Sequence, residues 1–551
     1  MSAAPSTASA TGRLAVGLGL VTLVAGAAWL RFASLDHGLP LLRGRPDELE
    51  VIEATKTFPA GDFNPRFFVY PNFFFYLVYG WIRMVLAIRR LGGDARADYT
   101  TLLGSGVPAL IFYGRTFTAA VGTASVAAAF AIGRRAGGTA LGLVTAALLA
   151  ANFLHVRDSH ALKPDVLLGI CMLASLWCLS RWVETPNRRR AIVAGLAVGL
   201  TMAIKYNGVF LLVPAYVEDV LATRRRGWRR LLPGPSLVLV AVIAGATFLV
   251  ACPYLLLDFG RATFTSWFLA FTVFSTRPQS ALPAGAGWLD VPLHFVRTRA
   301  FGYHLTTSLW HGFGWLATLA TPVAIVRAAL RRHPPVFRMS AVFVVTYYLV
   351  IGAAPVHLVR YFTALVPVLS FLLAALIVDL ARRIRPAIVR AAVAAAVTAA
   401  LCAQPIASAV AHVRIAAETD TRVLAAQWMR TNLPPNAFVA VLGATLFTYA
   451  DPELPPGVRR APPGLADDTY AREGVTHVVT HEHRIPFSRL DPAQMARLGP
   501  HLRLLAEWSP FAAGPAGGFE DEDAFYIPFY DIAGVTRPGP LVRVYAYEAG
   551  S

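Results

Sequence analysis

The sequence predicts a polytopic α-helical membrane protein with a small α/β domain at its carboxyl terminus. Of its 551 residues, 56% are hydrophobic and only 15% are charged, and the mean hydropathy is +0.53. Many apolar runs approach the roughly 20 residues that a helix needs to cross a bilayer. The basic residues form short clusters between these runs, as they do in cytoplasmic loops. The net charge of +18 therefore indicates membrane topology and argues against a nucleic-acid partner.

Twelve hydrophobic runs are candidates for membrane helices. They lie near 14–31, 67–88, 115–133, 137–155, 166–183, 191–204, 208–221, 236–253, 303–326, 336–353, 361–381 and 386–404. The basic clusters between them are 133–138, 181–190, 224–230, 327–333 and 382–386. If all of these clusters face the cytoplasm, the opposite side receives the loops 155–165, 253–261 and 355–361 and the chain after 404.

Counting the crossings tests this arrangement. With the amino terminus inside, "RPDELE" (45–50) is outside, and an even number of spans must separate it from "HVRDSH" (155–160). Three candidates lie between them, so one does not cross. The run 67–88 carries Pro71, Asn72, Arg83 and many aromatic rings, a mixture that suits a helix lying in the membrane interface. We therefore expect about eleven spans, with juxtamembrane helices in the first outer loop.

Three regions follow from this topology. Residues 1–13 are expected to be a disordered cytoplasmic tail, 14–404 a transmembrane domain, and 405–551 an extracytoplasmic α/β domain. The first apolar run lacks a small-residue cleavage site and is expected to remain as an anchor in the plasma membrane. In 405–551 the sequence predicts a helix that begins at Thr419 or Asp420, then a Pro-Pro turn, and then strands, including 476–481 and 541–548.

The runs 191–204 and 208–221 are short and are separated by "KYNG" (205–208). This pattern predicts a hairpin of half-length helices whose polar bend faces an external cavity.

Polar side chains gather in the segments that this topology places outside. They are Asp47, Glu48, Tyr70, Asn72, His155, Arg157, Asp158, His160, Lys163, Asp165, Lys205, Tyr206, Asn207, Asp258, His304, His357, Arg360 and Tyr361. Charged groups at a membrane edge need water or a partner. Such a set suits transfer chemistry on a substrate with an anionic head and a lipid tail. Cations would hold the phosphate, and a carboxylate would accept a proton from an attacking hydroxyl.

Each of these residues also has a structural alternative. Asp47 and Glu48 follow a proline and would make a good helix start. Lys205 could extend to the membrane surface, and Arg360 could be a boundary anchor. An interfacial salt bridge would account for Arg157, Asp158 and His160. No single residue decides between the two interpretations. What favours a functional site is that all of these residues are expected on the same side of the membrane.

Six segments, in order, resemble a known family. They are "PDE", "NPRFFVYPNFFFYL", "HVRDSHALKPDVLL", "GLAVGLTMAIKYNGVFLLVPA", "VRYFTALVPVLSFLLA" and "AAQWMRTNLPPNAFVAV". In these segments the chain resembles the C-type glycosyltransferases, specifically the branch that depends on polyprenyl-phosphate sugars. That branch includes protein O-mannosyltransferases, of the family 39 type, and the aminoarabinose transferases that modify lipid A.

The resemblance implies a role for each matching residue. Asp47 corresponds to the catalytic carboxylate of the first loop, with Glu48 beside it, and either Asp158 or Asp165 corresponds to the acid of the second loop. The donor phosphate would be bound by Lys205, Arg360, Arg157 and Tyr361, and the rest of the substrate by Tyr70, Asn72, His160 and Tyr206. The family's His-Pro-Pro before the aromatic stretch is "VYPN" here, so Tyr70 or Asn72 would have to replace that histidine.

The expected activity is inverting transfer of a sugar from a polyprenyl-phosphate donor to a glycan, lipid or protein acceptor on the outer face of the membrane. No G-x-x-x-x-G-K-[ST] motif is present, as expected when the donor already carries its phosphate. Some relatives use a divalent cation, but no ligand spacing here indicates one, so no cofactor is assigned.

Two other functions compete with transfer. A lipid-linked-sugar transporter or flippase would usually show internal repeats and polar residues at the midplane of the bilayer. Here the acids cluster in loops and no repeated halves are visible. A non-catalytic scaffold would not need these acids and cations.

Overall fold

The computed structural model describes residues 10–42, 44–222, 227–265, 299–331, 333–354, 357–443, 450–485, 488–512, 518–519, 523 and 525–549. The chain forms two compact units. The first unit comprises Met1–Phe32, Glu53–Leu103 and Tyr113–Ala409, and the second comprises Ala33–Ile52, Gly104–Phe112 and Val410–Ser551. The tail predicted for 1–13 lies mostly outside the described residues, and α1 begins at Ala10.

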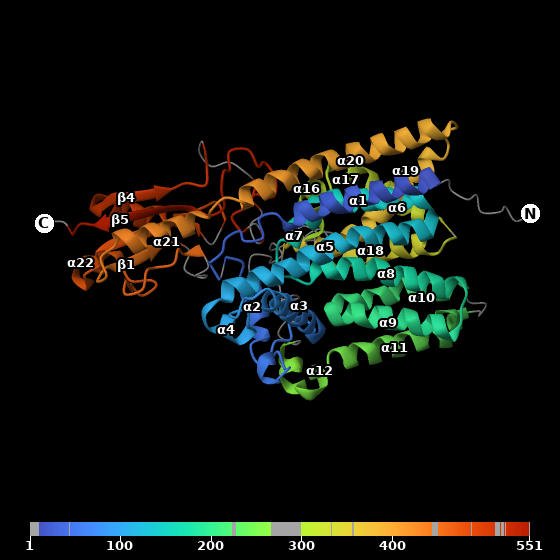
Figure 1. The fold of residues 1–551 in the computed structure, drawn as a ribbon, viewed down its shortest axis with the longest axis horizontal. Helices are drawn as coiled ribbons and strands as arrows, with labels where there is room; N and C mark the ends of the chain where they lie inside the picture. The colour runs from blue at the N-terminus through green and yellow to red at the C-terminus, as the bar shows by residue number, and fades with distance from the viewer. Residues whose placement is uncertain are drawn as a thin grey trace, which may run out of the picture. The chain divides into compact units, whose positions relative to one another are not determined.

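The first unit is a bundle of helices (Figure 1). Its longer helices are α1 (Ala10–Phe32), α3 (Asn72–Leu91), α5 (Val107–Gly137), α6 (Thr139–Ala151), α8 (Asp165–Glu184), α9 (Arg188–Ile204), α10 (Leu212–Ala222), α11 (Pro235–Ala251), α17 (Trp315–Ala329), α18 (Val336–Gly352), α19 (Val366–Ala381) and α20 (Ala387–Ala416). The short helices that matter for the site are α7 (Phe153–Ser159), α12 (Tyr254–Leu257) and the 3₁₀ helices η2 (Tyr206–Leu211) and η6 (Val359–Leu365).

Helices that could cross a membrane are numerous in this unit. Among the described residues, six helices are long and apolar enough, or eight if each of two bent helix pairs counts as one span. The helices α9, α10 and α18 have 17, 11 and 17 residues, fewer than the roughly 20 of a full crossing. The chain is thus a multi-pass helical protein, but the predicted number of eleven spans is not confirmed.

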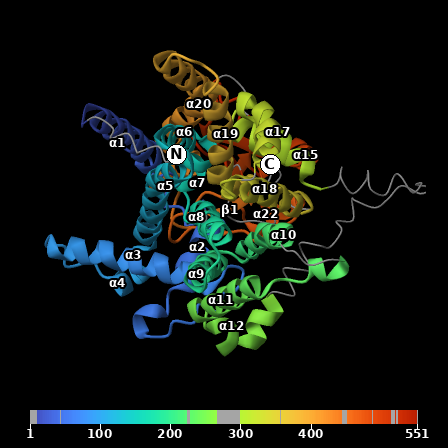
Figure 2. The same cartoon turned by 90° about the vertical axis from the view of Figure 1, so that its right-hand side faces the viewer.

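The run 67–88 forms α3, which is not among those membrane-crossing candidates. Figure 2 shows α3 side-on, whereas α8 and α9 are seen more nearly end-on. One face of α3 is buried at Phe74, Phe75, Val78, Ile82 and Leu86, while Arg83, Arg89 and Arg90 are exposed. This pattern is typical of a helix that lies in a membrane interface, as the crossing count requires.

The basic clusters gather at one end of the first unit. In Figure 1 their described parts lie at the end of the bundle where α1 begins. Arg190 donates to the carbonyl of Arg181 at 3.1 Å, and Arg382 donates to that of Gly137 at 3.4 Å. The first bond closes the loop between α8 and α9, and the second joins the end of α19 to the loop between α5 and α6, as the positive-inside pattern predicts for loops that share one side of a membrane.

The bend between α9 and α10 depends on Gly208. A Cβ at this position would lie only 2.6–2.8 Å from backbone atoms of Thr201 and Met202. The chain folds directly back on the last turn of α9, and only glycine allows that approach. The chain therefore turns at η2, at the polar segment between the two short runs, whereas α9 packs mainly on α11 and α8.

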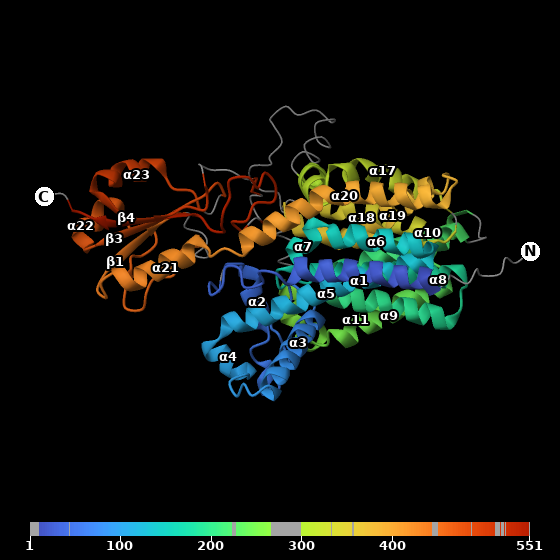
Figure 3. The same ribbon diagram turned by 45° about the horizontal axis from the view of Figure 1, so that its top comes forward.

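The second unit contains a five-stranded sheet in the order β2-β1-β3-β5-β4 (Figure 3). Its strands are β1 (Phe438–Leu442), β2 (Arg459–Arg460), β3 (His477–Glu482), β4 (Leu502–Trp508) and β5 (Leu541–Tyr547). The helix α21 (Thr421–Asn432) begins after Asp420, whose side chain accepts the amide of Arg422, as the sequence predicts. The strands predicted at 476–481 and 541–548 correspond to β3 and β5.

Helices cover both faces of this sheet. Val439, Val479 and Val544 pack against Ala425 and Met429 of α21. The alternate residues face the other side, which α22 (Tyr470–Glu473) and α23 (Pro492–Leu498) cover. Figure 3 shows α21 and α23 on opposite faces. The unit is therefore a three-layer α/β/α domain, in which side chains alternate along each strand.

A chain of buried polar groups ties the strands to the loops. His481 Nε2 lies 2.9 Å from Asp451 Oδ1, and His481 Nδ1 lies 3.1 Å from the hydroxyl of Ser488, which contacts Tyr526. Burial raises the pKa of Asp451, but hydrogen bonds from His481 and Arg460 outweigh it and hold that pKa below its ordinary value. The network needs the charged carboxylate, so it persists at neutral pH.

His483 makes the second unit sensitive to acid. Its ring lies among Phe511, Phe519 and Tyr526, and burial lowers its pKa to about 3. Below pH 6.5 the unfolded chain binds a proton at this ring, but the folded chain does not, so acidification lowers the free energy of unfolding.

We predict that going from pH 7 to pH 5 lowers the local unfolding free energy by about 2 kcal/mol through this residue. His483→Phe should remove that share of the pH dependence. Hydrogen exchange of the β3 and β5 amides, measured in the full chain at both pH values, tests this. An identical pH dependence in the variant and the wild type would contradict it.

Candidate active site in the helical unit

A buried ion pair joins two loops of the first unit. Lys205 follows the last residue of α9, and its Nζ lies 2.6 Å from Oδ1 of Asp165, the first residue of α8. The two side chains are 12% and 2% exposed. A carboxylate in the first turn also interacts favourably with the helix dipole. The pair therefore fixes an ammonium group close to the surface of the bundle.

The segment η6 lies against this ion pair and against α7. The ring of Tyr361 lies 5.2 Å from Lys205 Nζ, within the range of a cation–π contact. The hydroxyl of Thr363 donates to Asp158, which also accepts a hydrogen bond of 3.2 Å from Arg157. Arg157 and Asp158 are buried.

Gly169 of α8 permits this approach. A Cβ there would lie 3.2 Å from the carbonyl oxygen of Ala364 and 3.0 Å from Pro367. Its missing side chain therefore lets the end of η6 and the start of α19 pack directly on α8.

The aromatic stretch before α3 reaches the same region. The hydroxyl of Tyr206 donates to the carbonyl of Phe68 at 2.9 Å, so the stretch contacts the bend between α9 and α10. Tyr70 packs against Phe67, Phe74 and Phe75 with ring centroids 5.9–6.5 Å apart. Tyr206, which like Tyr70 is predicted to bind substrate, is therefore linked to this aromatic stretch through the carbonyl of Phe68.

Asn72, at the start of α3, is fully buried. Neither its amide nitrogen nor its side-chain oxygen has a hydrogen-bond partner among the residues that the structure describes. A buried amide without a partner is costly and usually signals a water or ligand.

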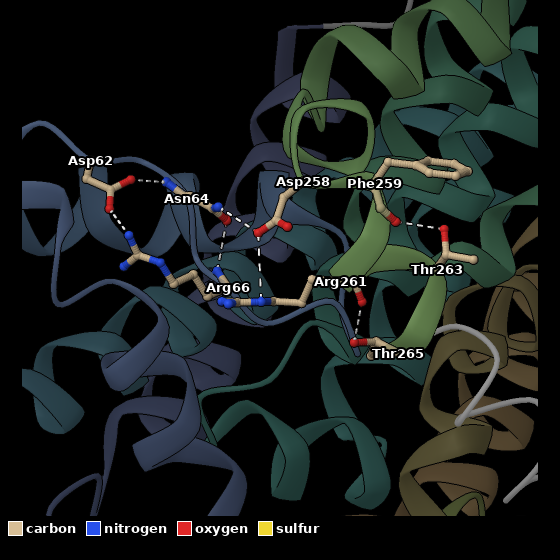
Figure 4. A network of polar contacts seen from close by, with 8 residues as sticks. All are labelled: Asp62, Asn64, Arg66, Asp258, Phe259, Arg261, Thr263 and Thr265. Atoms are coloured by element: carbon tan, nitrogen blue, oxygen red, sulfur yellow. Dashed lines mark hydrogen bonds and ion pairs between the residues drawn. The ribbon is translucent and has the colours of Figure 1, made fainter.

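A second polar network holds the segment before the aromatic stretch (Figure 4). Asn64 donates to the carboxylate of Asp258 at 2.9 Å and, through its backbone, to Asp62 at 3.1 Å. Arg66 contacts Asp62, and Arg261 lies 4.0 Å from Asp258. These bonds attach residues 62–66 to the segment after α12, so Asp258 has a structural partner in the segment before the aromatic stretch.

Other predicted residues are placed nearby. Arg360 lies on η6 next to Tyr361 and is half-buried. His160 is buried, with Nδ1 2.9 Å from the carbonyl oxygen of Val156. The ring of His357 stacks on that of Tyr303 at 5.2 Å, and the ring of His304 lies beside Tyr303 at 5.4 Å.

Tyr347 and Thr363 were missed by sequence reasoning. The hydroxyl of Tyr347 accepts a hydrogen bond of 3.2 Å from the side chain of Asn207, and Thr363 binds Asp158. Both lie inside long apolar runs, where a hydroxyl-bearing residue resembles ordinary helix packing. For Tyr347, the signal in the sequence was the polar bend "KYNG", because its Asn207 needs a hydrogen-bond partner in a neighbouring apolar run.

Asp47 and Glu48 lie in the second unit, in the first turn of α2 (Pro46–Ala54). Glu48 is buried and Asp47 is half-buried. The guanidinium of Arg45 lies 5.5 Å from the ring centroid of Phe525, and Ser34 donates to the carbonyl of Val413 at 3.1 Å. The loop that carries the expected catalytic carboxylate is thus built into the same unit as the carboxyl-terminal domain, which the sequence did not indicate.

The second unit also has a cavity of about 90 Å³ at the carboxyl end of β1. Asp451, Arg460 and His481 line it, but these groups already bind one another. We therefore assign them to the structure of the sheet. Among the described residues, no group of three or more His, Cys, Asp or Glu side chains is arranged to hold a metal ion.

The ion pair between Lys205 and Asp165 gives a direct prediction about stability. Asp165→Asn leaves a mostly buried ammonium without its carboxylate, which should cost about 3 kcal/mol. Thermal unfolding of the purified protein measures the loss. Glu53→Gln is the matched control, because the pair between Glu53 and Lys56, at 2.9 Å, is exposed and worth about 0–1 kcal/mol. Equal shifts in melting temperature would contradict the role of the buried pair.

The chain was compared with protein families, curated proteins and solved structures. Residues 102–254 match the family described as dolichyl-phosphate-mannose-protein mannosyltransferase. No match was found among curated proteins.

Several solved structures resemble the chain. The oligosaccharyltransferase of Archaeoglobus fulgidus in the apo form has a TM-score of 0.53 at 11% identity, covering 98% of this chain and 89% of that one. The same enzyme tethered to an acceptor peptide has a TM-score of 0.55 at 11% identity, covering 97% and 89%. ArnT from Cupriavidus metallidurans in the apo state has a TM-score of 0.49 at 14% identity, covering 96% and 98%.

At 11% identity, the likeness to the oligosaccharyltransferase structures establishes a shared fold, and the family match covers the segment that contains the ion pair. Together they confirm the predicted resemblance of this chain to C-type glycosyltransferases, including the protein O-mannosyltransferases, and the predicted enzyme class.

Proposed function

We propose that this protein transfers a sugar, with inversion, from a polyprenyl-phosphate donor to a glycan, lipid or protein acceptor on the outer face of the membrane. The observation that carries the proposal is the ammonium of Lys205, held 2.6 Å from Asp165 at the end of α9 that lies opposite its basic start, Arg188–Arg190. The matching family is itself named for dolichyl-phosphate-mannose, a lipid-phosphate sugar.

The donor phosphate would bind to Lys205 and Arg360, with Arg157 and Tyr361 beside them. As the bond to the sugar breaks, negative charge grows on the leaving phosphate. A cation already fixed in place stabilises that charge without reorganisation, which is worth a few kcal/mol at a partly dry site. In this account Asp165 positions Lys205. Asp158 holds Arg157 and Thr363 through hydrogen bonds.

The acceptor would be activated by Asp47, with Glu48 as its neighbour. The carboxylate of Asp47 accepts the proton of the acceptor hydroxyl while that oxygen attacks the anomeric carbon and the lipid phosphate leaves. Asn72, Tyr70, Tyr206 and His160 would contact the sugar. The amide of Asn72 has no hydrogen-bond partner among the described residues, which supports this assignment, because a sugar hydroxyl could both donate to it and accept from it.

The proposed topology has eleven spans, a cytoplasmic amino terminus and an extracytoplasmic carboxyl-terminal domain in the plasma membrane. It is supported by the grouping of the basic loops at one end and by α3, which is not among the membrane-crossing candidates.

One observation favours a second function, a transporter or flippase for lipid-linked sugars. The helices α9 and α10 are broken at a polar bend, a feature of transporter binding sites. A radiolabelled polyprenyl-phosphate sugar incubated with membranes separates the two. Transfer predicts label covalently attached to an acceptor, whereas transport predicts label that moves between leaflets and remains on the lipid.

We predict that Asp47→Asn lowers the transfer rate by roughly 10²–10⁴-fold, the usual contribution of a general base. Donor binding and membrane insertion should be retained, because the amide has nearly the same shape as the carboxylate. The assay is sugar transfer by purified protein in lipid nanodiscs.

Glu50→Gln serves as the matched control, since Glu50 lies on the same helix and is exposed. An Asp47→Asn variant as active as the Glu50→Gln control would remove Asp47 as the base.

A further inference from the structure

A second charged pocket lies at the other end of the first unit, where the basic loops gather. Five helices begin or end there: α5 at Gly137, α6 at Thr139, α17 at Ala329, α18 at Val336 and α19 at Ala381. The pocket has a volume of about 310 Å³. Because membrane helices end near the lipid headgroups, this pocket lies at the level of those headgroups.

The pocket has more positive than negative charge. Arg331 and Arg382 share one carboxylate, that of Asp379, with Arg382 Nη1 3.6 Å from Asp379 Oδ1. Burial and repulsion from Arg382 and Arg327 lower the pKa of Arg331. One carboxylate cannot neutralise two guanidinium groups, so the site would gain from a further anion.

The floor of the pocket is apolar. Leu141, Phe337, Ala375 and Val378 form it. The guanidinium of Arg331 lies 4.3 Å from the ring centroid of Phe337, which in turn stacks on Phe371 at 5.0 Å. This contact holds the cation against the buried apolar residues, so the pocket combines basic side chains with an apolar lining.

We propose that this pocket binds an anionic phospholipid of the membrane leaflet on that side. Its phosphate would contact Arg382 and Arg331, and the first part of an acyl chain would lie along Leu141 and Phe337. Basic pockets between membrane helices commonly hold anionic headgroups. This site is distinct from the donor site that we propose around Lys205, and its test does not depend on sugar transfer.

The test uses the full-length protein in detergent, with native mass spectrometry to count bound lipid. Phosphatidylglycerol should bind the wild type more tightly than phosphatidylcholine does. Arg382→Gln should weaken phosphatidylglycerol binding roughly tenfold, because a charge-assisted hydrogen bond is lost. Arg382 is exposed, so the variant should fold, and its melting temperature in phosphatidylcholine checks this.

Arg385→Gln is the matched control. It removes the same charge from the same loop, and Arg385 does not line the pocket. Retention of binding in this control supports the proposal. Equal losses in the two variants would overturn it, as they would indicate only general attraction to surface charge. Stabilisation by inorganic phosphate equal to that by phosphatidylglycerol would also overturn it, in favour of a free-anion site.

Discussion

The proposed chemistry depends on one buried contact, the ion pair between Lys205 and Asp165. An ammonium group on a flexible four-carbon stem would normally extend into water. Here it is held by a carboxylate at the start of α8 and lies beside the ring of Tyr361. Three segments far apart in sequence, the α7–α8 junction, the α9–η2 bend and η6, must meet for this to occur.

Glycines make that meeting possible. Gly208 lets the α9–η2 bend fold back on α9, and Gly169 lets η6 approach α8. The aromatic stretch before α3 then covers the bend through the bond between Tyr206 and Phe68. The geometry of the cation therefore follows from backbone packing as much as from charge. The cation–π contact between Arg45 and Phe525 ties the loop of Asp47 to the carboxyl-terminal domain.

The sequence predicted much of this arrangement but not all of it. Hydrophobic runs located the helices, and the arginine clusters predicted which loops share an end, because lipid imposes both rules on the chain. The Pro-Pro turn and the strand-like runs that follow it predicted the strands of the second unit. The number of spans could not be fixed, since α9, α10 and α18 are shorter than a full crossing. Tyr347 and Thr363 could not be predicted, because a hydroxyl in an apolar run shows its role only once its hydrogen-bond partner is known. The pairing of Lys205 with Asp165 was also not foreseen, although both residues were selected.

Binding of a polyprenyl phosphate to the purified protein tests the central claim most directly, because it isolates the phosphate site from catalysis. If the ammonium fixed by Asp165 holds the phosphate, Lys205→Met and Asp165→Asn should each weaken binding roughly tenfold or more. Lys56→Met, which removes an exposed lysine, should leave it unchanged. Wild-type affinity in both of the first two variants would contradict the account.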